Sequence, residues 1–265
     1  MRRVAVSLLL LVTLMLALAN WVAPFPYARQ FRDAPDAPPS RHFLLGTDAL
    51  GRDRLSRMLY GARISLLLAP GAALVSGGLA LAVGLLAGCL GRRVERAVTV
   101  AADLCLSLPW LFALLAIRAV LPLNASATAS ALSTFGLLGL LGWAGPCRII
   151  LVAVKRHLGS DFVLLARASG CSAGRLAAVH LIPNLLPLAR AQFLVTVPAF
   201  LLAEANLGLL GLGIPEPVPS WGGMLRELEN LPGAVAHPWI CAPALLLMIV
   251  ISSFHLLVSA DKDRV

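Results

Sequence analysis

The stretch DFVLLARASGCSAGRLAAVHLIPN, residues Asp161 to Asn184, is polar, carries two arginines and lies between two long apolar segments. It is too charged to stay in lipid, because a charged side chain at the centre of a membrane helix costs about 2.5–3.5 kcal/mol. The stretch has helical character on both sides of Gly170, and glycine permits a backbone turn that a side chain would obstruct. A loop of this kind is suited to docking a second protein at the membrane face. The sequence therefore predicts a membrane protein that is driven by something it does not itself contain.

The composition excludes an ordinary soluble domain. The chain has 265 residues, of which 59% are hydrophobic and 13% charged, and its mean hydropathy is +0.85. Soluble domains contain about 45–50% apolar and about 25% charged residues. The net charge of +9 could indicate nucleic-acid binding, but the arginines lie at the ends of apolar segments and in loops. Membrane lipids and the positive charge of cytoplasmic loops explain it better, so we expect lipid contact and no nucleic-acid partner.

The cysteines give no sign of a disulfide framework or a metal site. They are odd in number, scattered, and mostly inside apolar runs, without any CxxC pair or metal-ligand spacing. We interpret them as small apolar side chains that fill space. They are Cys89, Cys105, Cys147, Cys171 and Cys241.

Six apolar segments are long enough to cross a bilayer, which takes about 20 residues each. They are Val4 to Ala23, Ile64 to Leu90, Ala97 to Leu121, Ala131 to Val154, Leu188 to Leu212 and Ala234 to Val258. The first could instead be a cleaved secretory signal, because Ala17-Leu18-Ala19 resembles a cleavage site, but the apolar run continues past it. We therefore predict an all-α polytopic membrane protein with six transmembrane helices.

The predicted organisation has two parts. Residues 1–62 are expected to form the first span, an extracytoplasmic linker and a short interfacial helix, and residues 63–260 a five-helix core with a cytoplasmic loop at 155–187. Asp48 is the expected cap of the short helix, which would lie in the interface plane. Its apolar side would hold Leu50, Leu55, Met58 and Leu59, and its other side Arg52, Arg54 and Arg57. In the core, Gly84-x-x-x-Gly88 predicts a face where helices approach closely.

The short loops indicate the orientation. Gly91 to Arg96 holds three arginines, whereas Pro122 to Ser130 holds none. Positive charge in short loops favours the cytoplasmic side. We therefore expect both termini of this multi-pass chain to be cytoplasmic.

Three motifs together carry a resemblance to a known family. They are GTDALGRDRLSRMLYGARISL at 46–66, the loop ending in HLIPN at 180–184, and EANLGLLGLGIPEPVPSWGGML at 204–225. The chain resembles, from about His42 to Met224, the inner-membrane permease subunits of dipeptide/oligopeptide/nickel ATP-binding cassette importers. The resemblance implies a type I importer fold in a bacterial inner membrane. It also implies a second related permease, two cytoplasmic ATPase subunits that bind ATP–Mg, and an extracytoplasmic solute-binding protein.

The same resemblance assigns the polar loop as the segment that couples to the ATPase. Ala166, Gly170 and Pro183 fall on positions expected to be Ala, Gly and Pro, but the usual glutamate falls on Leu164. Loss of this polar anchor predicts weaker coupling, with a fuller motif in the partner permease. The candidate coupling residues are Ala166, Arg167, Ala168, Gly170, Cys171, Arg175, His180 and Pro183. On spacing alone, the loop could also be an ordinary amphipathic connector.

Three polar residues inside apolar spans are candidates for the translocation path: Asp103, Glu204 and Asn206. One acid at mid-membrane cancels the gain from about six aliphatic residues, so it is not expected to face lipid. Alternatively, Asp103 snorkels or caps near the cytoplasmic end, and Glu204 hydrogen-bonds a neighbouring helix. The proline-rich loop Ile214 to Trp221 could contact the binding protein or form a lid. Its alternative is an interfacial turn anchored by Trp221.

The sequence contains no motif of an enzyme. The five histidines are far apart, and neither HExxH, GxSxG nor a nucleotide-binding GxxxxGK[ST] occurs. We therefore expect a transport subunit that binds no cofactor and has no nucleotide site. Peptide is the default solute by frequency within the family, with nickel complexes and opines as alternatives. A self-contained secondary transporter would predict paired broken helices in two halves, and no internal repeat is found.

Overall fold

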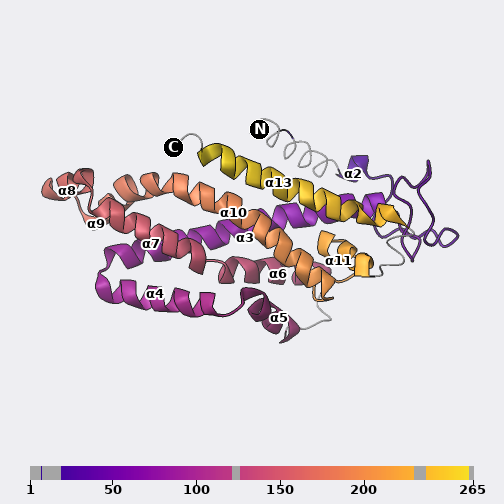
Figure 1. Ribbon diagram of the computed structural model, residues 1–265, viewed down its shortest axis with the longest axis horizontal. Coiled ribbons are helices and arrows are strands. Elements are labelled where there is room, and N and C mark those ends of the chain that lie inside the picture. The colour runs from indigo at the N-terminus through magenta and orange to yellow at the C-terminus, as the bar shows by residue number, and fades with distance from the viewer. Residues whose placement is uncertain (1–6, 8–18, 121–125, 230–236, 263–265) are drawn as a thin grey trace. The chain divides into compact units, whose positions relative to one another are not determined.

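The computed structural model describes residue 7 and residues 19–120, 126–229 and 237–262, which are helical with connecting loops (Figure 1). This part of the chain contains no β-strand beyond an isolated bridge between Thr47 and Asp53. The all-α prediction is therefore confirmed. The predicted first span, Val4 to Ala23, lies mostly outside the described residues. Within this predicted span, the structure describes Ser7, the short helix α2 (Ala19–Val22) and Ala23.

The chain divides into two compact units, which alternate along the sequence. The first comprises Met1–Pro70, Leu115–Phe135 and Val197–Val265, and the second Gly71–Leu114 and Gly136–Thr196. All four boundaries between these segments fall inside helices, so the division does not follow the predicted boundary at residues 62 and 63. That predicted boundary stays a prediction.

Most of the predicted spans correspond to long apolar helices. Four stretches are long and apolar enough to cross a membrane: Arg54–Cys89, Ala127–Leu158, Ala173–Leu209 and Pro238–Ser259. A fifth is added if the bent pair Arg92–Ser107 and Leu111–Val120 counts as one span. The elements within these stretches include α3 (Arg54–Cys89), α4 (Arg92–Ser107), α5 (Trp110–Val120), α6 (Ala127–Leu141), α7 (Ala144–Leu158), α10 (Ile182–Leu209) and α13 (Ala242–Lys262). The polytopic prediction is confirmed, whereas the count of six includes the span that lies mostly outside the described residues.

Proline explains why the predicted span Ala97 to Leu121 is broken. Helix α4 ends at Ser107, and Leu108 has an extended backbone with φ −78° and ψ 130°. The ring of Pro109 disfavours a helical conformation for the residue before it. The expected single helix is therefore two, α4 and α5.

In the second unit, the predicted close-packing face is confirmed. A Cβ atom at Gly84 would lie 2.9 Å from Cγ2 of Ile150, and one at Gly88 would clash with Val154. Both neighbours belong to α7. Glycine thus lets α3 and α7 approach closely, which is how membrane helices gain dispersion energy without a hydrophobic driving force.

The start of α3 corrects the predicted interfacial helix. Residues 54–62 are the first turns of the continuous helix α3, so no separate short helix is present there. Asp48 does not cap it; instead the N–H of Ser56 donates to Oδ2 of Asp53 over 2.7 Å. Arg52, Arg54 and Arg57 were expected on the polar face of an interfacial helix, and all three are buried. Carboxylates from distant parts of the chain pair with them, which makes their burial possible.

Within the first unit, the segment after α10 folds back against α10 and α13. Helix α11, Trp221–Leu225, contacts α13, and a Cβ atom at Gly208 would clash with the backbone of Gly222. The indole of Trp221 is fully buried and its Nε1–H donates to the carbonyl of Met58 over 3.3 Å. The alternative interpretation of Trp221 as a headgroup anchor is therefore wrong.

Candidate functional site

The polar stretch Asp161 to Asn184 forms two helical pieces that meet at Gly170, as predicted. Helix α8 spans Asp161–Ala168, and α9, Ala173–Arg175, continues through the π-turn η1, Leu176–Leu181, into α10 (Figure 1). Gly170 has φ +79°, and a Cβ atom there would meet nothing within 4 Å. Glycine is therefore favoured by the left-handed backbone and not by lack of space.

Backbone hydrogen bonds close the end of α8. The N–H of Cys171 donates to Ala166 over 3.0 Å, and that of Gly170 donates to Arg167 over 3.0 Å. This 6→1 and 5→2 pair is the Schellman arrangement, which satisfies carbonyls that a helix end leaves free. The turn that reverses the chain at Gly170 is thus built from its own backbone.

A buried apolar cluster fixes the segment on α7. Its members share near-complete burial and come from α7, α8, η1 and α10: Ile150, Val154, Val163, Leu176, Leu181 and Leu185. Ala166 and Cys171, two of the predicted coupling residues, pack against this cluster. Burial of this many aliphatic side chains, at about 25 cal/mol per Å² of apolar area, holds the segment in a defined position on the second unit.

The opposite side of the segment is exposed. Of the predicted coupling residues, Arg167, Ala168, Gly170, Arg175 and Pro183 are exposed, while His180 is half-buried beside Phe162, with the ring centroids 6.5 Å apart. Leu164 and Leu165 expose 52% and 69% of their surface. Two adjacent exposed leucines on an eight-residue helix form an apolar patch that a partner protein could cover. The position expected to hold glutamate, Leu164, is part of this patch.

Two prolines lie near the start of α10 without ending it. The helix runs through both Pro183 and Pro187. The π-turn η1 lies just before Pro183, where the N–H of Ile182 donates to the carbonyl of Ala177. Because proline has no N–H to donate, a local change of helical register at this point accommodates it.

The three translocation-path candidates lie in different surroundings. Glu204 is buried in the first unit, and the hydroxyl of Ser65 on α3 donates to its Oε2 over 3.3 Å. Asn206, two residues along the same helix, is exposed. Asp103 forms an ion pair with Arg148 of 2.8 Å in the second unit, with both side chains about half exposed. The contact with Ser65 fits the structural alternative for Glu204, whereas the ion pair of Asp103 belongs to neither of its two interpretations. The predicted pathway roles stay predictions.

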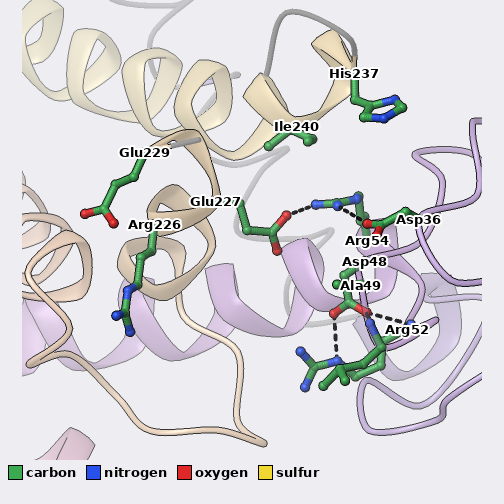
Figure 2. Close-up of a pocket in the computed structure, with 11 residues that line it drawn as sticks. Asp36, Asp48, Ala49, Arg52, Arg54, Arg226, Glu227, Glu229, His237 and Ile240 are labelled. Atoms are coloured by element: carbon green, nitrogen blue, oxygen red, sulfur yellow. Dashed lines mark hydrogen bonds and ion pairs between the residues drawn. The ribbon is translucent and has the colours of Figure 1, made fainter. Parts of the chain in front are cut away.

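Sequence reasoning missed a buried charge cluster in the first unit. Arg52 Nε lies 2.7 Å from Oδ2 of Asp48, and Glu216 accepts from Arg52 and Arg57, each over 2.7 Å. Arg54 pairs with Glu227 and lies 3.7 Å from Asp36. We call Arg52, Arg54 and Arg57 with these acids the arginine cluster; Figure 2 shows Arg54 between Glu227 and Asp36.

The cluster keeps its charges paired despite burial. Burial by itself lowers the pKa of Arg52, but hydrogen bonds and negative charge from Glu216 and Asp48 outweigh it, so the pKa is raised above its ordinary value. The guanidinium is therefore charged at every physiological pH. The cluster borders a cavity of about 560 Å³ lined by Asp36, Asp48, Ala49, Leu50, Arg52, Arg54, Arg226, Glu227, Glu229, His237 and Ile240 (Figure 2).

Comparison with known proteins identifies the family. A family model described as the binding-protein-dependent transport system inner membrane component matches residues 80–261. The chain belongs to this family. As a member it is a membrane-embedded permease component of a binding-protein-dependent importer, and the predicted resemblance is confirmed.

Several relatives cover almost the whole chain. The di/tripeptide transport system permease protein DppC of Pseudomonas aeruginosa is 32% identical over 263 residues, 96% of this chain and 84% of that protein. The dipeptide transport system permease protein DppC of Escherichia coli K12 is 33% identical over 252 residues, 92% of this chain and 81% of that protein. The oligopeptide transport system permease protein OppC of Bacillus subtilis is 29% identical over 261 residues, 98% and 83% of the two chains. This permease component is therefore similar to relatives named for peptide transport.

Proposed function

We propose that this permease subunit transports peptides and forms half of a translocation pathway, the other half coming from a second, homologous permease. The names of the relatives support this solute class, because those that match most of the chain are named for dipeptide, di/tripeptide or oligopeptide transport. A nickel- or opine-type uptake permease is the alternative, and a self-contained secondary transporter is a more distant one.

The observation that carries the proposal is the two-sided construction of residues 161–184. Val163 and Leu176 anchor the segment in the buried cluster, while Leu164 and Leu165 are exposed. A rigidly held loop with an uncovered apolar patch is what a motor protein needs to move the helices behind it. We propose that this patch docks on one of two cytoplasmic ATPase subunits, which bind the ATP–Mg that this chain does not bind.

The proposed orientation follows from that docking. The segment and both termini are assigned to the cytoplasm of a bacterial cell, and the arginine cluster and the loop Ile214 to Trp221 to the extracytoplasmic side. A solute-binding protein would deliver the solute on that side. Glu204, Asn206 and Asp103 remain the candidates for residues along the path.

Cysteine crosslinking tests the coupling. Leu165→Cys, placed in a variant whose own cysteines are replaced, is expected to crosslink to an ATPase subunit that co-purifies with the chain. Leu44, which is also exposed but belongs to the proposed extracytoplasmic linker, provides the matched control Leu44→Cys. A membrane-impermeant thiol reagent added to intact spheroplasts should label the control and spare the test variant. The reverse labelling pattern, or a chain active in transport without any ATPase, would overturn the proposal.

A further inference from the structure

Arg118 is a buried arginine whose hydrogen-bond partners among the described residues are all neutral. Its side chain comes from α5 in the first unit and is only 3% exposed. Its Nε–H donates to the carbonyl of Leu212 over 3.2 Å, and Nη2 donates to the hydroxyl of Ser130 and, over 3.5 Å, to the carbonyl of Gly213. Within the described residues, Nη1 has no hydrogen-bond partner and no carboxylate lies within ion-pair distance of the guanidinium.

A buried guanidinium without a counter-ion is costly. Removing a charge from water costs several kcal/mol unless an opposite charge or several hydrogen bonds offset it. The carbonyls of Leu212 and Gly213 follow the C-terminal end of α10, whose dipole offers a partial negative charge worth about 0.3–1 kcal/mol. That interaction explains where Nε and Nη2 point, but it leaves Nη1 and most of the positive charge uncompensated.

The guanidinium borders a cavity of about 400 Å³, lined by Arg118, Gly208, Gly211, Leu212, Gly213, Ile214, Pro215, Glu216, Gly223 and Arg226. The acidic residue in this lining, Glu216, is already paired with Arg52 and Arg57. Arg226 forms no ion pair within the part of the chain that the structure describes, and Figure 2 shows its side chain pointing away from the arginine cluster. The cavity therefore presents two arginines that pair with no acid among the residues that the structure describes.

The second arginine lies beside a glycine. The Cζ of Arg226 lies 3.4 Å from the place where a Cβ atom of Gly211 would be, which is an ordinary van der Waals distance. Gly211 also has φ +74°, a backbone conformation that side chains rarely adopt. The turn after α10 thus brings a second guanidinium to the same cavity as Arg118.

We propose that this cavity binds a carboxylate of the transported solute, the free C-terminal carboxylate in the case of a peptide. Guanidinium groups bind carboxylates through a planar pair of N–H donors, and Nη1 of Arg118 donates to none of the described residues. The inference rests on the proposed function for the solute class. It adds a recognition site in the permease itself, at the end of α10 that we assign to the extracytoplasmic side.

The test compares two probes that differ in one group, dialanine and its C-terminal amide. Saturation-transfer NMR is measured on the purified full chain together with any subunits that accompany it. Dialanine should bind the wild type, and Arg118→Gln should weaken that binding about tenfold or more, since one charge-assisted hydrogen bond contributes about a factor of ten. Dialanine amide lacks the carboxylate, so it should bind the wild type as weakly as dialanine binds Arg118→Gln.

Two further variants keep the test decisive. Arg226→Gln alters an exposed side chain of the same cavity, so it should fold and should also weaken dialanine binding. Arg41→Gln removes an exposed charge from the linker and should leave binding unchanged. Equal binding of the two probes to the wild type, or unchanged dialanine binding in both cavity variants, would show that Arg118 serves only to cap α10. Displacement of dialanine by equimolar inorganic phosphate would instead show a general anion site and overturn the assignment to the solute.

The outcome separates this inference from the proposed function. Arginine-dependent dialanine binding by a chain that never co-purifies with an ATPase would contradict the proposed coupling and leave the site intact. Co-purification of an active transporter that shows no such binding would contradict the site alone.

Discussion

Nη2 of Arg57 donates to Oε1 of Glu216 over 2.7 Å, which joins the start of α3 to a loop 159 residues further along the chain. Arg57 is buried, whereas 59% of the Glu216 side chain is exposed. An accessible carboxylate therefore pairs with two inaccessible guanidiniums, those of Arg52 and Arg57, and Asp48 supplies the second negative charge. The ion pairs of Glu216 and the burial of Trp221 hold the loop Ile214 to Trp221 in place.

Replacing this acid should destabilise the first unit. We expect Glu216→Gln to lower the free energy of unfolding by about 1–2 kcal/mol, less than for a fully buried pair because water reaches the carboxylate. Thermal unfolding in detergent measures the change. Glu229→Gln is the matched control, because Glu229 is exposed and forms no ion pair within the described residues. Equal melting temperatures for the two variants would contradict the role of Glu216.

The contact between Gly208 and Gly222 should tolerate no side chain. A Cβ atom at Gly208 would overlap the backbone of Gly222, which cannot move as a side chain can. We expect Gly208→Ala to cost about 1–3 kcal/mol or more through overpacking. Gly77→Ala, at a helical glycine with nothing within 4 Å, should be neutral or stabilising by up to about 1 kcal/mol. The yield and the melting temperature of each purified variant measure the difference. Equal stability of Gly208→Ala and Gly77→Ala would contradict the close approach of Gly208 to the backbone of Gly222.

Gly170 should matter through its backbone alone. Gly170→Ala is expected to cost about 1–2 kcal/mol locally, because an L-residue is strained at φ +79° even where space is open. The strain should reorient α8 and reduce solute-stimulated ATP hydrolysis by the assembled transporter. Gly174→Ala, four residues away in α9 and equally open, should leave hydrolysis near the wild-type rate. Equal rates for both variants would mean that the turn at Gly170 plays no part in coupling.

The leucine at the expected glutamate position offers a gain-of-function prediction. Leu164 is half exposed, so Leu164→Glu should not disturb the buried cluster. If a polar anchor strengthens coupling, the variant should transport more solute per ATP hydrolysed than the wild type. The neighbouring substitution Leu165→Glu should not, because it removes apolar surface at a position that is not expected to be glutamate. Uptake and phosphate release measured in the same proteoliposomes give the solute transported per ATP hydrolysed for each variant. A lower ratio for Leu164→Glu than for the wild type would show that coupling depends on the apolar side chain of Leu164.

Local features of this protein were accessible from the sequence. The apolar spans, the turn at Gly170 and the close face at Gly84 and Gly88 depend on solvent preference, on one residue's backbone freedom or on helical spacing. The turn and the close face are present as predicted, and so are the apolar spans within the described residues, except that the span Ala97 to Leu121 is broken into two helices. The break at Pro109 is local too, and its signal in the sequence was the proline itself.

The electrostatics of the first unit depended on tertiary structure. From the sequence, Arg52, Arg54 and Arg57 suggested the polar face of an interfacial helix, because charged residues without visible partners belong in water. Their partners Glu216 and Glu227 are 159 to 173 residues distant, and no periodicity connects them. The sequence by itself determined which segments leave water and where the chain must turn, since those choices rest on each residue and its near neighbours. Only the folded chain decided which charges could be buried, because a guanidinium leaves water only where distant acids or carbonyls are brought to meet it.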